Sequence, residues 1–180
     1  MADRRRRQEL WCVTVTRLRS EVDGLSAVER EWIACRLTRI EEIQQDLQAL
    51  FTGAGGAFAC DQCGGSCCER GTHHLTLANL LHWLLAGEEP PEPDFAATCP
   101  FLGAAGCRLP AARRPFNCII FFCEGVEERL SLAKRSTFRR LEQQLREIYL
   151  AFDRRYAGSS LRGLLIRAET LGAKPFLDRL

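Results

Sequence analysis

The placement of cysteine constrains this chain more than any other feature of its sequence. Eight of its ten cysteines fall between Cys60 and Cys123. The stretch begins with CDQCGGSCC, continues through TCPFL and a later GC, and ends with RRPFNCIIFFC. Cysteine thiolates are ligands of zinc ions and of iron–sulfur clusters. The stretch therefore predicts a metal site around which the rest of the chain must fold.

The candidate metal ligands are the eight cysteines of this stretch: Cys60, Cys63, Cys67, Cys68, Cys99, Cys107, Cys118 and Cys123. Cys60 and Cys63 form a CxxC pair, in which a tight turn would direct both sulfurs toward one ion. Cys67 and Cys68 are adjacent, and because adjacent side chains diverge, we expect them to serve different ions or different corners of a cluster. Eight thiolates equal two sets of four, which fits two zinc sites, one iron–sulfur cluster with a further site, or one cluster with spare thiols.

A proline-rich segment carries half of these cysteines. Residues 87–125 contain six prolines and several glycines, which exclude a long helix or a central strand. A loop of this length in a compact domain needs some other source of order, and metal–thiolate bonds would provide it. Its CIIFF segment is apolar enough to form core or a short strand. Arg114, just before Pro115, is the preferred residue to offset the negative charge of the thiolates.

Helical periodicity flanks the cysteine stretch on both sides. Apolar residues at spacings of three and four predict helices over residues 4–22, 26–51, 75–86, 126–156 and 160–171. Ser26 and Glu29 form a capping-box pattern, in which the serine oxygen and the glutamate carboxylate would each accept a backbone N–H. Ser160 has the position of a cap for the last helix. Residues 56–72, with the first cysteine cluster, are expected to be loop.

These patterns predict a mostly α fold, with a helical bundle-like scaffold and an irregular, metal-ordered cysteine-rich segment. Residues 1–55 would form N-terminal helices, residues 56–125 the metal-binding segment and residues 126–180 C-terminal helices, all within one compact domain.

Composition narrows the range of partners and of compartments. The formal net charge is +2 and no run approaches the ~18–20 apolar residues that a membrane span needs. We therefore expect no nucleic-acid partner and no membrane, and a cytoplasmic location. In a reducing cytosol, cysteines are more often metal ligands than disulfides.

Other residues are weaker candidates. His73 and His74 follow the first cluster and are potential imidazole ligands, although eight thiolates make them unnecessary. His82 is expected to face solvent or a helix neighbour. Cys12 and Cys35 lie in helical stretches and are expected to be small buried hydrophobic residues. The sequence contains no Ser/His/Asp constellation, phosphate loop or HExxH motif, so no catalytic residue is assigned.

The same cysteines carry a resemblance to a known family. CDQCGGSCC, then CPFL with Cys107, then RRPFNC with Cys123, resembles the CxxCxxxCC…CPFL…C…RPxxC…C arrangement of the YkgJ-type cysteine-cluster family. That family is described as a zinc- or iron-chelating domain. The resemblance covers residues 60–123, with all eight cysteine positions filled. A related module in flagellin lysine methylases is regarded as the holder of an iron–sulfur cluster. The resemblance implies metal binding, but no particular reaction.

We therefore expect a soluble metal-binding protein whose eight cysteines hold an iron–sulfur cluster, with 4Fe–4S as the preferred form, and/or Zn²⁺. The compact glycine-rich motif and the apolar CIIFF segment, which would shield a cluster from water, favour iron–sulfur. Two alternatives stay open. One is an enzyme of methyltransferase-like or redox type that uses the cluster. The other is an interaction module in which metal is only a staple and the helices dock a protein partner.

Overall fold

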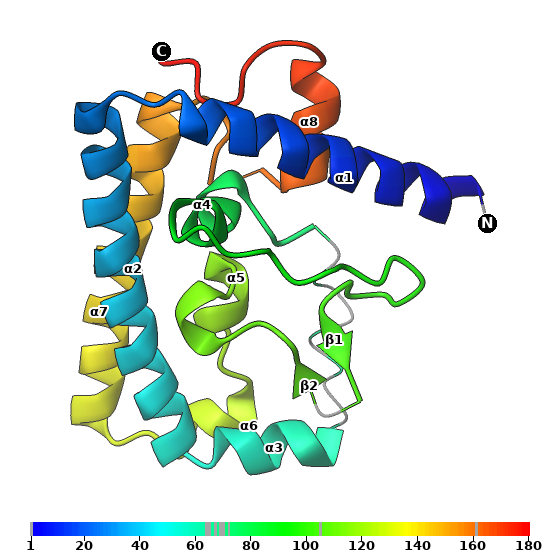
Figure 1. Cartoon of the computed structure of the whole chain (residues 1–180). Helices are drawn as coiled ribbons and strands as arrows, with labels where there is room; N and C mark the ends of the chain where they lie inside the picture. The colour runs from blue at the N-terminus through cyan, green and yellow to red at the C-terminus, as the bar shows by residue number, and fades with distance from the viewer. Residues whose placement is uncertain are drawn as a thin grey trace.

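Two long helices, α2 (Ala27–Gly53) and α7 (Leu132–Arg155), pack along each other and form one side of the molecule (Figure 1). The computed structural model describes residues 2–63, 66, 68, 71, 73–104, 106–160 and 162–180. In this part of the chain α-helices dominate, and the strands amount to one two-residue pair. The fold is thus mostly α, as the sequence predicts.

One of the two hydrogen bonds of the predicted capping box is present at the start of α2. The Ser26 hydroxyl accepts the backbone N–H of Glu29 at 3.2 Å, which satisfies one unpaired donor at the helix start. The Glu29 carboxylate does not complete the box as predicted. It binds Arg155 and Tyr156 at the far end of α7, because a buried carboxylate gains more from a cation than from a backbone amide.

The terminal helices, α1 (Ala2–Asp23) and α8 (Leu164–Leu171), pack against each other at one end of the α2–α7 pair (Figure 1). The prediction that Ser160 caps the last helix is wrong, since α8 begins after Gly163. The Ser160 hydroxyl instead donates to the Tyr149 carbonyl at 2.6 Å, which ties the chain back to α7.

The short helix α4 (Leu77–Leu85) lies at the centre of the molecule, between α1 and α2. All its residues from Leu77 to Leu84 are buried. Thr76 precedes the helix as predicted, and its N–H and hydroxyl both donate to the Asn79 side-chain oxygen, at 3.0 and 2.8 Å. Gly87 ends the segment with a φ of 69°, a conformation that glycine adopts at little cost.

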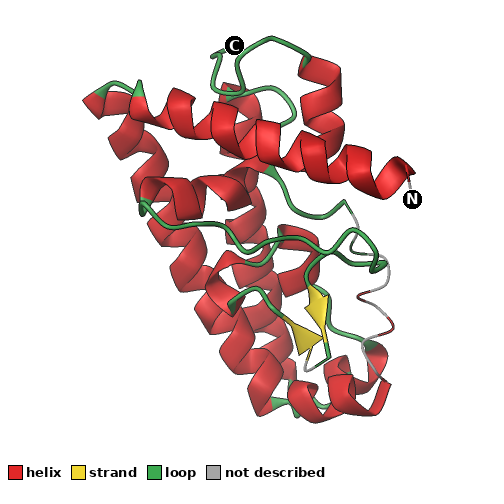
Figure 2. Cartoon of the chain, turned by 45° about the vertical axis from the view of Figure 1, so that its right-hand side comes forward, coloured by secondary structure: helices red, strands yellow, loops and turns green. Residues whose placement is uncertain are grey.

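Short elements make up the cysteine-rich part of the chain. They are α3 (Gly56–Cys63), β1 (Leu102–Gly103), β2 (Gly106–Cys107), the 3₁₀ helix η2 (Ala111–Arg113), α5 (Phe116–Ile119) and α6 (Glu124–Glu127). Figure 2 shows the strand pair and the loops gathered on one side of the helices. As predicted, the described part of residues 87–125 contains no long helix or central strand. The CIIFF segment contributes Ile119 and Phe122 to the core and does not form a strand.

Two apolar clusters hold these layers together. The larger joins the inner faces of α2 and α7 to α4, α1 and α8, with Ile33, Ile43, Leu145 and Phe152 among its fully buried members. The smaller consists of Ala54, Phe122, Val126 and Leu130. It sits where α3 and α6 meet. No described helix is both long and apolar enough to cross a membrane.

Candidate metal centre

Cys60 and Cys63 lie one turn apart in α3. The prediction of a loop over residues 56–72, with a tight CxxC turn, is therefore wrong for this part. Gly55, at a φ of 72°, lets the chain leave α2 and change direction, and the run Ala57–Ala59 then supports a new helix. The Cys63 thiol donates to the Cys60 carbonyl at 3.5 Å, so both cysteines occupy adjacent turns of one short helix.

Cys99 and Cys107 are brought together by a small hairpin. Its strands pair antiparallel with Leu102 opposite Cys107, and the Arg108 N–H donates to the Phe101 carbonyl at 2.8 Å. Burial raises the pKa of the Cys99 thiol, and the nearby Cys107 adds to this shift. The backbone N–H groups of Phe101 and Leu102 lower the pKa of this thiol and so oppose the shift. Nearby amide N–H groups favour the thiolate, the form in which sulfur binds metals.

Gly71 fits between Cys68 and Cys99. Its N–H donates to the Cys68 carbonyl at 2.9 Å. A Cβ at this position would lie 3.0 Å from the Cys68 carbonyl oxygen and 3.1 Å from the Cys99 sulfur. Both distances are shorter than most Cβ contacts, so a side chain at this position would push its neighbours away by a few tenths of an ångström.

Cys118 joins this group from α5. Burial, with smaller contributions from the neighbouring thiols of Cys107, Cys99 and Cys68, raises the pKa of its thiol to about 12. The His74 Nδ1 lies 3.2 Å from the Cys118 sulfur. Burial also lowers the pKa of His74, with a smaller contribution from His73. Both shifts favour neutral groups, so an S–H to Nδ1 hydrogen bond fits the arrangement.

Two arginines stand close to the thiols. The Arg114 guanidinium donates to the Leu109 carbonyl at 3.1 Å and lowers the pKa of Cys118, against the larger effect of burial. Arg108 donates to the Pro100 carbonyl at 2.6 Å and opposes the rise in the pKa of Cys99. The sequence-based choice of Arg114 as a counter-charge therefore agrees with its position. Arg113 instead pairs with Glu88.

A buried polar network anchors the chain just before Cys118. The side-chain amides of Gln44 and Asn79 both donate to the Arg114 carbonyl, at 2.8 and 3.1 Å. Asn79 also donates to the hydroxyl of Tyr149 at 3.1 Å. Sequence patterns missed these residues, because Gln44, Asn79 and Tyr149 occupy ordinary helix positions. Only the packing of three helices brings them together.

Cys123 directly precedes α6. Its carbonyl accepts the N–H groups of Val126 and Glu127, both at 2.9 Å. The side chains of Cys123 and Ala59 both border the smaller apolar cluster, and α6 packs against α3. Cys123 is therefore on the element next to the one that carries Cys60 and Cys63.

The structure thus places seven of the eight candidate cysteines, and Cys67 lies outside the described residues. Cys68, Cys99, Cys107 and Cys118 are neighbours, and Cys60, Cys63 and Cys123 belong to the α3–α6 region. Among the described side chains, no three His, Cys, Asp or Glu residues lie in an arrangement that would hold a metal ion.

Two expectations about other residues are wrong, those of burial for Cys12 and Cys35, whereas for His82 the structure excludes only the solvent-facing alternative. Cys12 and Cys35 are exposed on α1 and α2, so they do not belong to the apolar face of either helix. His82 is buried, at 7% exposure, because α4 is covered on all sides. Burial, together with the charge of Arg113, lowers the pKa of His82 to about 4, so its imidazole is neutral.

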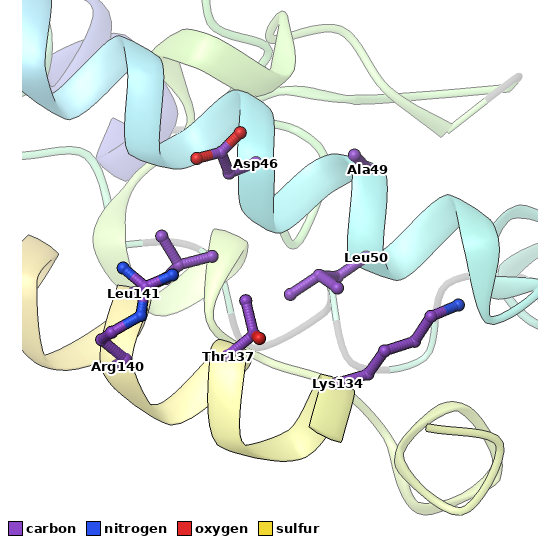
Figure 3. A pocket seen from close by; sticks show the side chains of 7 residues that line it. All are labelled: Asp46, Ala49, Leu50, Lys134, Thr137, Arg140 and Leu141. Atoms are coloured by element: carbon purple, nitrogen blue, oxygen red, sulfur yellow. The ribbon is translucent and has the colours of Figure 1, made fainter. Parts of the chain in front are cut away.

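A pocket of about 360 Å³ lies elsewhere, between α2 and α7 (Figure 3). Its lining residues are Asp46, Ala49, Leu50, Lys134, Thr137, Arg140 and Leu141. Figure 3 shows the charged groups of Asp46, Lys134 and Arg140 spread around the opening, without a common focus. A binding pocket usually has a few convergent polar groups, so the cysteine region is the better candidate for a functional site.

Comparisons of this chain with protein-family models, with curated proteins and with solved structures gave no match.

Proposed function

We propose that this protein binds metal through its eight cysteines, as an iron–sulfur cluster, as Zn²⁺ or as both. The observation that carries the proposal is that Cys68, Cys99, Cys107 and Cys118 come from three segments and lie near enough for the first three to influence the pKa of Cys118. Four thiols, of which Cys99 is buried and the other three are partly buried, would gain little by packing together as neutral side chains. A cation would let them ionise and would repay the cost of their burial.

The donor set suits both metals. Four thiolates complete a structural zinc site or hold a 4Fe–4S cluster. Arginines near Cys118 and Cys99 offset part of the negative charge that such a site carries. The backbone N–H groups that lower the pKa of Cys99 are of the kind that tunes iron–sulfur potentials and stabilises zinc thiolates. The resemblance of the cysteine spacing to a zinc- or iron-chelating family points the same way.

Elemental analysis after anaerobic purification tests this proposal. We expect metal in stoichiometric amounts, with a brown, visibly absorbing protein for iron–sulfur and a colourless one for zinc. Cys118→Ser should lower the bound metal, whereas the exposed Cys12→Ser should not. A wild-type chain that contains no metal, and takes up neither zinc nor iron with sulfide, would refute the proposal.

A further inference from the structure

The C-terminal segment, residues 172–180, follows α8 and forms neither a helix nor a strand. Figure 1 shows this segment, in red, leaving α8 and returning over α1. Gly172 begins it at a φ of 56°, a backbone conformation that glycine adopts at little cost. The position of the segment therefore depends on the side chains that surround it, because it has no hydrogen-bond ladder of its own.

Two side chains of α1 bind the main chain of the C-terminal segment. Arg17 donates to the carbonyls of Gly172 and Lys174, at 2.6 and 2.8 Å. The Glu21 carboxylate accepts two consecutive N–H groups, those of residues 176 and 177, at 3.1 and 2.8 Å. One turn of α1 thus provides both a donor for carbonyls and an acceptor for amides, as a site that binds an extended peptide does.

Phe176 is the most deeply buried residue of the segment, with no exposed surface. The guanidinium groups of Arg17 and Arg167 lie 5.0 and 5.4 Å from the centre of its ring. A cation at this distance is attracted to an aromatic ring. Arg167, on α8, also donates to the Phe176 carbonyl at 2.8 Å. Main-chain bonds and a pocket for one side chain are the two features that give peptide-binding sites their affinity and their specificity.

Arg167 has a donor that the C-terminal segment does not use. Its side chain is 3% exposed, and its Nη1 is buried without a hydrogen-bond partner among the described residues. Its other donors bind the carbonyls of Ala157 and Phe176, both at 2.8 Å. Burial lowers the pKa of Arg167 to about 10, against the smaller and opposite effects of Glu21 and Asp153. A buried donor without a partner costs free energy, so a ligand with one more acceptor would bind better than this segment does.

We propose that Arg17, Glu21 and Arg167 form a peptide-binding clamp, which the C-terminal segment occupies as an internal ligand. The partner that fits is an extended segment of another protein, with an aromatic side chain at the Phe176 position and an acceptor for the free donor of Arg167. The clamp contains no cysteine, so it is independent of the proposed metal binding.

The internal ligand has the advantage that it is tethered. A short tether gives an effective concentration in the millimolar range, so the segment occupies the clamp most of the time. An external peptide binds only the fraction of molecules in which the clamp is open, and its apparent affinity falls by that fraction. Weakening the internal segment should therefore strengthen the binding of an external one.

Peptide binding to the full-length chain tests the clamp. The probe is a fluorescent peptide with the sequence of residues 172–180, GAKPFLDRL. It should bind the Phe176→Ala chain at least about tenfold more tightly than the wild type, because the altered internal segment competes less. The same peptide with alanine in place of its phenylalanine should not bind. Ile166→Ala, at a partly exposed position of α8, is the matched control and should bind as the wild type does.

Second substitutions in the Phe176→Ala chain test which residues form the clamp. Arg17→Gln and Glu21→Gln should each weaken peptide binding by about 10–100-fold, because each removes hydrogen bonds to a charged group. Arg19→Gln, which breaks an exposed pair with Glu89, is the control and should leave the affinity unchanged.

Substituted peptides test the role of the free donor. Asparagine replaces each of residues 174–178 of the peptide in turn, except the phenylalanine. At least one of these peptides should bind the Phe176→Ala chain more tightly than the natural sequence, because its amide oxygen accepts from Arg167 Nη1. If none does, the free donor takes no part in binding and the proposed chemistry of the partner is wrong.

Amide hydrogen exchange in the wild type needs no substitution, and so covers the case in which a variant does not fold. The N–H groups of residues 176 and 177 should exchange faster than those of Ile43 and Leu47 in α2, because the segment opens without unfolding the core. Equal protection would show that the segment opens only when the whole chain unfolds, which would overturn the proposal.

Two binding results would also overturn it. One is a folded Phe176→Ala chain that does not bind the peptide, or binds it equally well after Arg17→Gln and Glu21→Gln. The other is a wild-type chain that dimerises as its concentration rises and loses the dimer in Glu21→Gln. That result would assign the clamp to a second copy of this chain instead of another protein.

Discussion

The α2–α7 frame and the cysteine region are stabilised by different means. The frame contains long helices with fully buried apolar faces, such as Ile33 and Ile43 on α2 and Leu145 and Phe152 on α7. The cysteine region contains helices of four to eight residues and a strand pair of two residues each. Isolated elements of that length are not stable, so this region depends on what it contacts.

The contacts of the cysteine region come from two sources. One is the frame itself, through the Gln44 and Asn79 amides that hold the Arg114 carbonyl. The other is the cysteines, whose burial as neutral thiols contributes little directional bonding. We infer that the frame folds independently of metal, whereas the cysteine region gains its final order from metal. Three substitutions in the frame or at its border test this difference.

The largest effect on the free energy of unfolding is expected from a substitution in the α2–α7 frame. Phe152 is fully buried and contacts the Trp32 ring edge-on, with 5.3 Å between ring centroids. Phe152→Ala should lower the free energy of unfolding by about 3–5 kcal/mol, because it leaves a cavity in a rigid core. Thermal unfolding should show the same loss with and without a metal chelator.

Leu132→Ala is the control for this variant, because Leu132 is 85% exposed on the same helix. Its expected change is within about 0.5 kcal/mol. A loss in Phe152→Ala that appears only in the chelated protein would contradict the independence of the frame.

The helices of the frame were predictable because the spacing of apolar residues that defines them is set by neighbours in the sequence. The spacing of apolar residues predicted α1, α2, α4 and α7, and Ser26 marked the start of α2. The errors occur where tertiary contacts override local preference. Glu29 leaves its capping role for a cation on α7, and Ser160 bonds back to Tyr149 instead of capping α8.

The sequence predicted which cysteines make up the candidate site, but not how they are arranged. Thiol number and spacing indicated metal, and the position of Arg114 before Pro115 indicated a counter-charge. Sequence could not show that the CxxC pair is helical, since α3 depends on a positive-φ Gly55 and on packing against α6. Nor could it show that Gly71 lies close to both the Cys68 carbonyl and the Cys99 sulfur, because Gly71 and Cys99 are far apart in the chain.

An intermediate effect on the free energy of unfolding is expected at the ion pair that joins α2 to α7. Glu29 is 7% exposed, and its carboxylate accepts from Arg155 Nε at 2.6 Å and from the Tyr156 hydroxyl. The Arg155 hydrogen bond outweighs burial and holds the pKa of Glu29 at about 2, below the ordinary value of 4.5. A lowered pKa stabilises the folded state above the ordinary value, and this contribution is lost as the pH falls from 4.5 toward 2.

Glu29→Gln should therefore cost about 2 kcal/mol at neutral pH, because it leaves a half-buried arginine without its anion. Across the acid range it should lose less stability than the wild type does. Chemical denaturation as a function of pH measures both effects, and Glu42→Gln, which removes an exposed pair with Arg39, is the matched control. Parallel pH curves for Glu29→Gln and the wild type would show that the pair contributes nothing.

The smallest effect on stability, and the most informative for the comparison, is expected at the border between the two regions. Asn79→Ala removes one of two amides on the Arg114 carbonyl and the donor to Tyr149. We expect the free energy of unfolding to fall by about 1–2 kcal/mol.

In the metal-free protein, alkylation of Cys118 should become faster, as mass spectrometry of labelled peptides can measure, while the exposed Cys35 reacts at an unchanged rate. Gln143→Ala, which removes an exposed amide that pairs with Glu147, should change neither property. If Cys118 stays equally protected in Asn79→Ala, the frame does not position this loop. The order of the cysteine region would then depend on the thiols and the metal alone.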